Sequence, residues 1–525
     1  MDNGKKIVAK RAGIVSAGTL ASRILGLVRE SVIAACFPKD AIDAYQVAFM
    51  IPNSFRRLTA EGAFSISLVT VFSKIWNEGN MDQSRDFARA IYGFSLLFLI
   101  ALVIAGVFGA HWLTLAAGAG FVADPAKFEL ATSLTRTMFP YIFFISLTAV
   151  AMGMLNATGR FFTPAFAPVL LNVSIIGCAV GLSGALPEWG INPIFALAAG
   201  VLIGGVAQLV IQIPSLKRLN LLAMPSLALS SPPLRRVLKM TAPMIIGVAA
   251  YQVFNFEATA FASTLKEGSV TYITFAQRLF ELPLAVLVMA ISTAALPSLA
   301  GLVGNKNMDG ALRIWNHSLR LALLVATPAM VAIIVLAEPL VTIMYQRGLF
   351  SHADAVETAG ALQWLAAGMC SVALLRQTVP FFYALEKVRV PVIMTLVMIG
   401  AYTLAALLLK DVFGHRGLCM SLSIATTLQA VGLFFALRKN VGLLGGKKLL
   451  KNWLRMLGAT VPMGIVIHYV SQLGNWSLGG NNLMNIGVLG LCVVTGILLY
   501  AVSAWLLRVS EFIEMMTAVR KRVQK

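Results

Sequence analysis

The feature that most constrains this chain is a succession of apolar stretches, each long enough to cross the roughly 30 Å hydrocarbon layer of a membrane, which takes about 20 helical residues. Hydrophobic residues make up 58% of the sequence and charged residues only 12%, whereas soluble domains have roughly 45–50% and about 25%. A water-soluble globule is therefore excluded. An all-α protein that crosses the membrane many times is predicted, because a helix satisfies its own backbone hydrogen bonds within lipid.

We predict fourteen membrane helices along the 525 residues. The second apolar stretch is too long for one straight span and has Pro52 near its middle, so a break in the helix is expected there. Irregular backbone at membrane depth is tolerated only where it is buried in protein or lines a cavity. The approximate limits are 9–36, 42–76, 87–117, 128–156, 163–184, 191–214, 237–263, 269–303, 311–338, 355–384, 390–410, 416–437, 453–473 and 483–508.

Basic residues are distributed unevenly over the predicted loops. If the N-terminus lies in the cytoplasm, the tails and the loops on that side hold about 28 Lys and Arg residues and the opposite loops about 6, as expected for basic cytoplasmic loops. Both termini are therefore expected in the cytoplasm. Basic loops that face anionic membrane lipids explain most of the net charge of +20, so nucleic acid is not needed as a partner.

The two halves of the chain show a weak internal repeat. We therefore predict an N-terminal lobe of six helices over 1–222, a C-terminal lobe of six helices over 223–443, and two further helices with a basic tail over 444–525. An even number of spans per lobe makes the repeats parallel, and such transporters bind their substrate between the lobes. The matches, in chain order, are Phe49 and Pro52 with Phe280 and Pro283; Ala157, Arg160 and Pro164 with Ala384, Lys387 and Pro391; and Gln208 and Leu216 with Gln429 and Leu437.

The basic residues inside the predicted spans decide the functional interpretation, and all of them are arginine. A charge at bilayer depth costs at least about 2.5–3.5 kcal/mol, so several together indicate a polar interior open to water. The forked guanidinium is the side chain best suited to phosphate. Extension of Arg23 or Arg29 toward an interface is the simpler alternative. The embedded arginines are Arg23, Arg29, Arg56, Arg57, Arg136, Arg278, Arg320 and Arg376, of which we predict that Arg23, Arg29, Arg56, Arg57 and Arg278 line a cationic cavity.

Carboxylates accompany these arginines and offer a simpler interpretation of some of them. Asn53, Arg57 and Glu61 follow one another at intervals of four residues and share a helix face. Arg57 and Glu61 could form an exposed pair worth about 0.3–0.5 kcal/mol, or both could line the cavity. Glu281, three residues after Arg278, could orient that guanidinium toward a substrate oxygen or form a purely structural buried pair with it.

Glu257 places a carboxylate inside the seventh predicted helix, next to Gln252 and Asn255. It could bind a coupling cation or a proton, or form hydrogen bonds between helices.

Sequence signatures of enzymes are absent. The segment 445–448, Gly-Gly-Lys-Lys, lacks the spacing and the Ser or Thr of a phosphate-binding loop. The cysteines and histidines are scattered, so no metal site and no cofactor are predicted, and a transporter is expected rather than an enzyme.

Five segments, spread in order over nearly the whole chain, carry a family resemblance. They are S-R-I-L-G-L-V-R-E (22–30), D-A-Y-Q-V-A-F-M-I-P-N-S-F-R-R-L-T-A-E-G-A-F-S (43–65), F-P-Y-I (139–142), P-A-F-A-P-V-L-L-N (164–172) and R-L-F-E-L-P (278–283). Together they resemble the MurJ (MviN) family of bacterial lipid II flippases, which belongs to the multidrug/oligosaccharidyl-lipid/polysaccharide (MOP) exporter superfamily. The part from Pro52 to Ser65 is the most specific.

The resemblance implies two lobes of six helices around a central cationic cavity, with the last two helices forming a groove for a polyprenyl tail. It implies that the substrate is lipid II, that the protein lies in the bacterial inner membrane, and that the cell-wall synthesis machinery is a candidate partner. Coupling to the membrane potential or to a monovalent cation is expected, although the seventh helix departs from the acidic pattern of some members and Glu257 is its nearest carboxylate. The functional charges carried over are Arg23, Arg29, Asp43, Arg56, Glu61, Arg278 and Glu281.

Three other functions remain as alternatives. A flippase for another polyprenyl-linked oligosaccharide would use the same arginines. A multidrug antiporter like those of the MATE family would need acidic residues in the cavity, because arginines there would repel cationic drugs. A glycosyltransferase or prenyltransferase would need a metal-binding acidic cluster and a large catalytic loop, and the aspartates at 40 and 43 have no second acidic cluster to accompany them.

Overall fold

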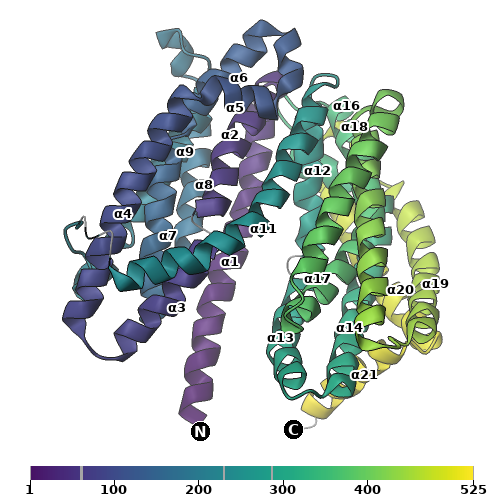
Figure 1. Ribbon diagram of the computed structural model, residues 1–525. Coiled ribbons are helices and arrows are strands. Elements are labelled where there is room, and N and C mark those ends of the chain that lie inside the picture. Colours follow the sequence, from purple (N-terminus) through teal and green to yellow (C-terminus); the bar gives the residue numbers. More distant parts are fainter. Residues whose placement is uncertain (1, 60–62, 227, 229–230, 285–287, 524–525) are drawn as a thin grey trace. The chain divides into compact units, whose positions relative to one another are not determined.

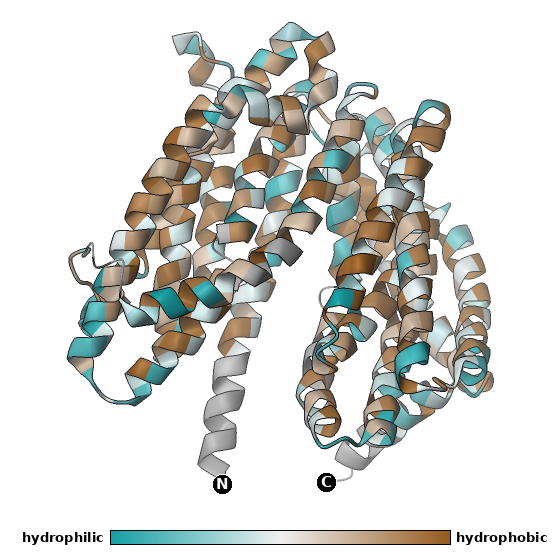
Figure 2. Cartoon of the chain, viewed as in Figure 1, coloured by the Kyte–Doolittle hydropathy of each residue, from teal (hydrophilic) through white to brown (hydrophobic). Residues whose placement is uncertain are grey.

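The apolar stretches of the sequence form helices in the structure. The computed structural model describes residues 2–59, 63–226, 228, 231–284 and 288–523, and within these ranges the regular structure is entirely helical, as predicted. Apolar residues cover most of the length of the long helices, whereas hydrophilic residues gather at helix ends and in connections (Figure 2). The contacts divide the chain into two units, Met1–Val270 and Thr271–Lys525, which are described separately.

The first unit is built on helix pairs that are distant in sequence. Helix α1 packs on α8, α8 on α9, α2 on α6, and α11 on α3 (Figure 1). Glycines permit the closest approach, because a Cβ atom at Gly200 would lie 2.6 Å from the Cα of Ile175 in the neighbouring helix. The helices are α1 (Asp2–Cys36), α2 (Lys39–Thr59), α3 (Ala63–Asn77), α4 (Met81–Phe108), α5 (Ala110–Ala117), α6 (Pro125–Met138), α7 (Tyr141–Ala157), α8 (Phe162–Leu182), α9 (Phe195–Val210), α10 (Ile213–Arg218) and α11 (Pro232–Ser263).

The second unit has its own apolar core, in which α14, α19 and α20 meet around Met456, Met463 and Cys492. Helix α12 begins at the end of the first unit and continues into the second. The C-terminal helix α21 contributes Phe512 to the same core. The helices are α12 (Ser269–Pro283), α13 (Met289–Gly304), α14 (Met308–Val335), α15 (Ala337–Tyr345), α16 (His352–Ala367), α17 (Met369–Ala384), α18 (Arg389–Val441), α19 (Gly446–Ser471), α20 (Leu483–Leu506) and α21 (Ser510–Val523).

Twelve of the fourteen predicted stretches coincide with a helix or with a pair of consecutive helices, and the other two share one long helix. Among the described residues, eight helices are long and apolar enough to cross a membrane, or nine if the pair α16 and α17, bent by 46°, is one span. The number fourteen therefore stays a prediction. The stretches 390–410 and 416–437 both lie in α18, whose direction changes at Gly414, a residue with a φ of +58°.

Two details of the predicted organisation differ from the structure. The break expected at Pro52 is wrong, because α2 continues through this proline to Thr59. A proline removes one helix hydrogen bond, and neighbouring protein makes this tolerable in a membrane helix. Helix α11, assigned to the C-terminal lobe by the repeat, packs on α2, α3, α4 and α5 and so belongs to the first unit by its contacts.

Candidate functional site

Arg29 is the centre of a buried polar cluster in the first unit, which we call the Arg29 cluster. Its guanidinium pairs with the adjacent Glu30, with Nη2 2.5 Å from Oε1, and its Nη1 donates to Oδ1 of Asn172 on α8 at 3.1 Å. Gln46 of α2 donates to the second oxygen of Glu30 at 3.5 Å, and Asn172 in turn donates to the carbonyl of Ser22 at 3.0 Å. These residues join α1, α2 and α8 in one network.

Burial makes this pair unusual for a membrane helix. Arg29 is 8% exposed and Glu30 1% exposed, and the Nε of Arg29 has no hydrogen bond to any residue that the structure describes. A buried ion pair is tolerable only when further hydrogen bonds satisfy both groups. The two amides, Asn172 and Gln46, supply part of this satisfaction. Arg29 was predicted from the sequence as a site residue. Gln46 and Asn172 were not, because Gln46 lies 16 residues from Glu30 and Asn172 lies 143 residues from Arg29.

The other predicted arginines of this unit lie on the same two helices. Arg23 on α1 and Arg56 on α2 are half-buried, whereas Arg57 is exposed. Asn53 is half-buried on α2. Glu61 lies outside the described residues, so its predicted pairing with Arg57 is not tested.

Asp43 forms a second buried site at the start of α2. Its carboxylate, 2% exposed, accepts a hydrogen bond from Nζ of Lys127 at 3.0 Å and one from the backbone N–H of Gly268 at 2.7 Å. Nearby, the backbone N–H of Gly120 donates to Oγ of Ser263, at the end of α11, at 3.0 Å. Asp43 therefore ties the connection between α11 and α12 to α2 and α6. No local sequence signal reveals Lys127 as its partner, because 84 residues separate them.

The second unit contributes Arg278, which is half-buried on α12. Glu281 is exposed three residues further along the same helix. This spacing allows contact on a helix without requiring it, so the supporting role of Glu281 stays a prediction. Glu257 of α11 is half-buried, and next to it Asn255 donates to Gln252 at 3.3 Å, which satisfies part of the polar run within the helix.

Two embedded arginines outside the predicted cavity have structural partners. The Nε of Arg320 on α14 lies 3.0 Å from Oε1 of Glu511, which is fully buried on α21 and also accepts a hydrogen bond from Asn452 of α19. Arg376 on α17 donates to the carbonyl of Leu284 at 3.3 Å. The same sequence signal, an arginine in an apolar stretch, therefore marks both buried anchors and candidate site residues.

Within the described ranges, no group of three or more His, Cys, Asp or Glu could hold a metal ion.

Comparisons with known proteins agree with the family resemblance. The family model described as lipid II flippase MurJ matches residues 33–486. The chain is 34% identical over 501 residues to the lipid II flippase MurJ of Burkholderia cenocepacia, covering 94% of this chain and 96% of that protein. It is 35% identical over 437 residues to the probable lipid II flippase MurJ of Bdellovibrio bacteriovorus, covering 83% of each.

Solved structures show the same fold at lower sequence identity. A structure of lipid II flippase MurJ in an inward closed conformation superposes with a TM-score of 0.78 at 24% identity, covering 93% of this chain and 97% of that chain. An inward-facing multidrug resistance transporter of the MATE family, in the MOP superfamily, superposes with a TM-score of 0.65 at 17% identity, covering 81% and 96%. The predicted all-α membrane fold is thereby confirmed.

Proposed function

Because the chain belongs to the MurJ family of lipid II flippases, we propose that it moves lipid II, the polyprenyl-pyrophosphate-linked peptidoglycan precursor, from the cytoplasmic to the periplasmic leaflet. The head group, with its pyrophosphate, sugars and peptide, cannot cross hydrocarbon unaided. The polyprenyl tail is apolar and need not leave the membrane. The protein must therefore supply a polar route for the head group alone, and alternating access between the lobes supplies it.

The Arg29 cluster is the observation that carries this proposal. Arginine forms bidentate, charge-assisted hydrogen bonds with phosphate oxygens. In the structure the guanidinium of Arg29 is already paired with a carboxylate oxygen of Glu30 and oriented by Asn172. A pyrophosphate oxygen can take the place of the Glu30 oxygen, because both are anionic acceptors. We propose that Arg23, Arg56, Arg57 and, from the second unit, Arg278 add further donors along the route.

Asp43 has a supporting role in this proposal. Hydrogen bonds to Asp43 from Lys127 and from the backbone of Gly268 hold the connection between α11 and α12 in place. A change of access requires α11 or α12 to move, so these hydrogen bonds belong to one state of the cycle. We expect Asp43 to stabilise that state and not to touch the substrate.

The protein is a multi-pass membrane protein, and we place it in the bacterial inner membrane with both termini in the cytoplasm, on the distribution of Lys and Arg. A negative-inside potential of 100 mV favours export of one negative charge by about 2.3 kcal/mol and favours inward return of an empty cationic cavity by a similar amount for each positive charge. The membrane potential, or a monovalent cation bound near Glu257, is therefore the proposed driving force.

The cell-wall synthesis machinery, which would consume exported lipid II, is the proposed partner.

A MATE-like multidrug antiporter shares the fold, but a cationic drug would be repelled by the predicted arginines. A carrier of another polyprenyl-linked oligosaccharide would bind the same pyrophosphate, so only the sugar and peptide distinguish it. Competition between labelled lipid II and a polyprenyl pyrophosphate that lacks the peptide separates these two substrates. Equal competition would indicate that the pyrophosphate alone is recognised.

The deciding experiment is transport of labelled lipid II by the purified protein in proteoliposomes under imposed voltage, sodium and proton gradients. We expect the wild-type protein to transport lipid II and Arg29→Ala to lose transport. Arg136→Ala is the matched control, because Arg136 is an exposed arginine within a predicted span on α6. Equal loss in both variants would contradict the assignment of the site, and no transport by the wild-type protein under any gradient would contradict the function.

A further inference from the structure

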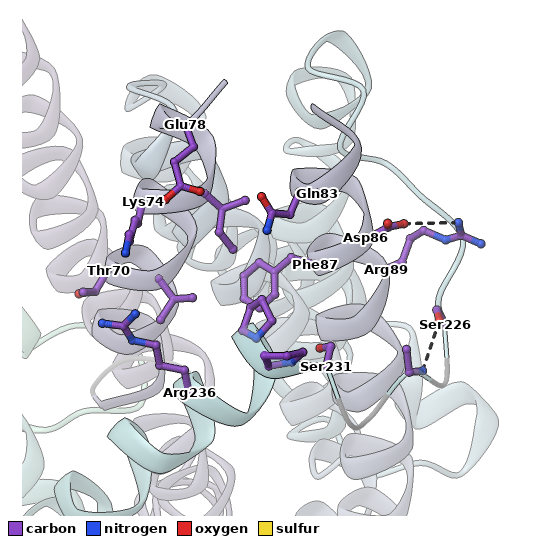
Figure 3. A pocket seen from close by; sticks show the side chains of 15 residues that line it. Thr70, Lys74, Glu78, Gln83, Asp86, Phe87, Arg89, Ser226, Ser231 and Arg236 are labelled. Atoms are coloured by element: carbon purple, nitrogen blue, oxygen red, sulfur yellow. Dashed lines mark hydrogen bonds and ion pairs between the residues drawn. The ribbon is translucent and has the colours of Figure 1, made fainter. Parts of the chain in front are cut away.

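A separate cavity of about 770 Å³ lies in the first unit where α3 ends, α4 begins and α11 begins. It is distant in sequence from the Arg29 cluster and shares no residue with it. Figure 3 shows its lining side chains, which come from these three helices and from the segment just before α11. This end of the helices is the one that the Lys and Arg distribution predicts to face the cytoplasm.

The floor of this cavity is rigid and apolar. Val71, Ile75 and Phe87 line it and belong to a core cluster that also contains Leu234 and Val237 of α11. Phe87 is 2% exposed and the two α11 residues are fully buried. The shape of the floor is therefore fixed by the packing of α3, α4 and α11, since close-packed cores resist deformation.

One wall is held by a close backbone contact. The N–H of Ser226 donates to the carbonyl of Arg89 on α4 at 2.9 Å. A Cβ atom at Gly93 would lie 1.9 Å from the carbonyl oxygen of Ser226, so only glycine allows the segment to approach the helix so closely. The cavity is thus a built feature of the fold and not a gap between loosely packed helices.

Some of the charged residues on the rim of the cavity form an ion pair and others do not. Arg89 and Asp86 form an exposed ion pair at 3.9 Å. Lys74 and Arg236, both exposed, form no ion pair within the part of the chain that the structure describes. Figure 3 shows their charged groups on the same side of the cavity, beside Thr70. Two cations from different helices therefore lie on one side of the cavity. Glu78, four residues after Lys74, also lines the cavity, but among the described residues it forms no ion pair with either cation.

Side chains, not backbone groups, would bind an anion here. The first helical positions of α11 are Pro232 and Pro233, which have no N–H to donate. Ser231, just before them, makes no side-chain capping bond, and its buried Oγ has no hydrogen-bond partner within the described residues. It is a further hydroxyl facing the same cavity.

We propose that this cavity binds a phosphate-bearing ligand, with Lys74 and Arg236 on the phosphate, the Ser231 hydroxyl as an additional donor and the apolar floor beneath the rest of the molecule. The Thr70 hydroxyl already donates to the carbonyl of Ile66. Paired cations with hydroxyl donors suit phosphate oxygens. Such a ligand would bridge α3 and α11 and hold the N-terminal half of α11 on the first unit. The phosphate can belong to an anionic phospholipid or to a soluble phosphate compound, and this inference does not depend on the transport function.

Equilibrium binding of radiolabelled dioctanoyl phosphatidylglycerol to the purified full-length protein tests the proposal, with inorganic phosphate, glycerol phosphate and dioctanoyl phosphatidylcholine as competitors. We expect saturable binding that Lys74→Gln and Arg236→Gln each weaken by about tenfold, the usual size of one charge-assisted contact. Competition by glycerol phosphate or inorganic phosphate would identify a soluble phosphate as sufficient. Failure of these anions and of phosphatidylcholine to compete would identify the anionic lipid.

Arg235→Gln is the matched control, because Arg235 is an exposed neighbour on the same helix that does not line the cavity. It removes the same charge about 100° away around the helix. Binding by this variant should stay close to that of the wild-type protein, and thermal unfolding of the three variants should be unchanged. Equal weakening by Arg235→Gln and Arg236→Gln, or no saturable binding of any probe, would overturn the proposal.

Discussion

The pairing of Arg29 with Glu30 predicts that folding and transport respond differently to mutation of the two residues. Arg29→Ala removes the guanidinium that pairs with Glu30, a residue that is only 1% exposed. Removing one partner of a buried pair costs about 3–5 kcal/mol, mostly because the other charge stays buried and uncompensated. The single variant should therefore be markedly destabilised, by an amount near the lower end of that range because Gln46 still donates to Glu30 at 3.5 Å.

The double variant Arg29→Ala/Glu30→Ala removes both charges together. It should be more stable than Arg29→Ala alone, with a coupling energy of about 2–3 kcal/mol in a double-mutant cycle. Transport should not recover, because the phosphate donor is still missing. Arg29→Lys keeps the ion pair but replaces the forked donor with a point charge, so it should restore stability better than transport.

Reversible unfolding in mixed micelles, followed by the loss of helical circular dichroism, measures the stabilities, and lipid II transport in proteoliposomes measures the function. In the double variant, stability should recover while transport stays lost. A coupling energy near zero would show that the pair does not stabilise the fold. Recovery of transport in the double variant would show that Arg29 acts only by neutralising Glu30, and the phosphate-binding role would be refuted.

Three further predictions concern other parts of the chain. Glu511→Ala leaves Arg320 without its carboxylate and should release α21, which increased proteolysis of the C-terminus would detect, whereas unchanged proteolysis would contradict the anchoring role. Gly490→Phe should impair binding of the lipid II tail without loss of thermal stability, because a Cβ atom there meets nothing within 4 Å, whereas Gly496→Phe should destabilise, because a Cβ atom there lies 3.3 Å from a neighbouring side chain. A cysteine at Lys266, with the native cysteines replaced, should react with impermeant thiol reagents only from the periplasmic side, and cytoplasmic labelling would contradict the predicted orientation.

Local signals in the sequence are sufficient for the helices and for the embedded arginines. Apolar length and charge within an apolar stretch are properties of neighbouring residues, so α8 and α20 lie close to their predicted limits and α1 ends at its predicted residue. The helix breaks were harder to place. Pro52 was expected to break a helix that continues through it, whereas the change of direction in α18 occurs at Gly414, whose left-handed φ only the structure reveals.

Partners of the charged residues could not be predicted, because tertiary packing brings them together over long sequence separations. Lys127 approaches Asp43 across 84 residues, and Asn172 approaches Arg29 across 143. No periodicity or spacing encodes such contacts.

Arg29 and Arg320 show why the partner of an arginine matters more than its presence. The counter-ion of Arg320 lies on another helix, α21, so this pair joins two elements and its loss would separate them. The counter-ion of Arg29 is the next residue of the same helix, and the neutral side chains of Gln46 and Asn172 connect this pair to α2 and α8. An incoming phosphate can therefore replace Glu30 at the guanidinium without breaking an ion pair between helices. This exchange is available to Arg29 and not to Arg320. It is the physical reason to propose that Arg29 binds the substrate and that Arg320 stabilises the fold.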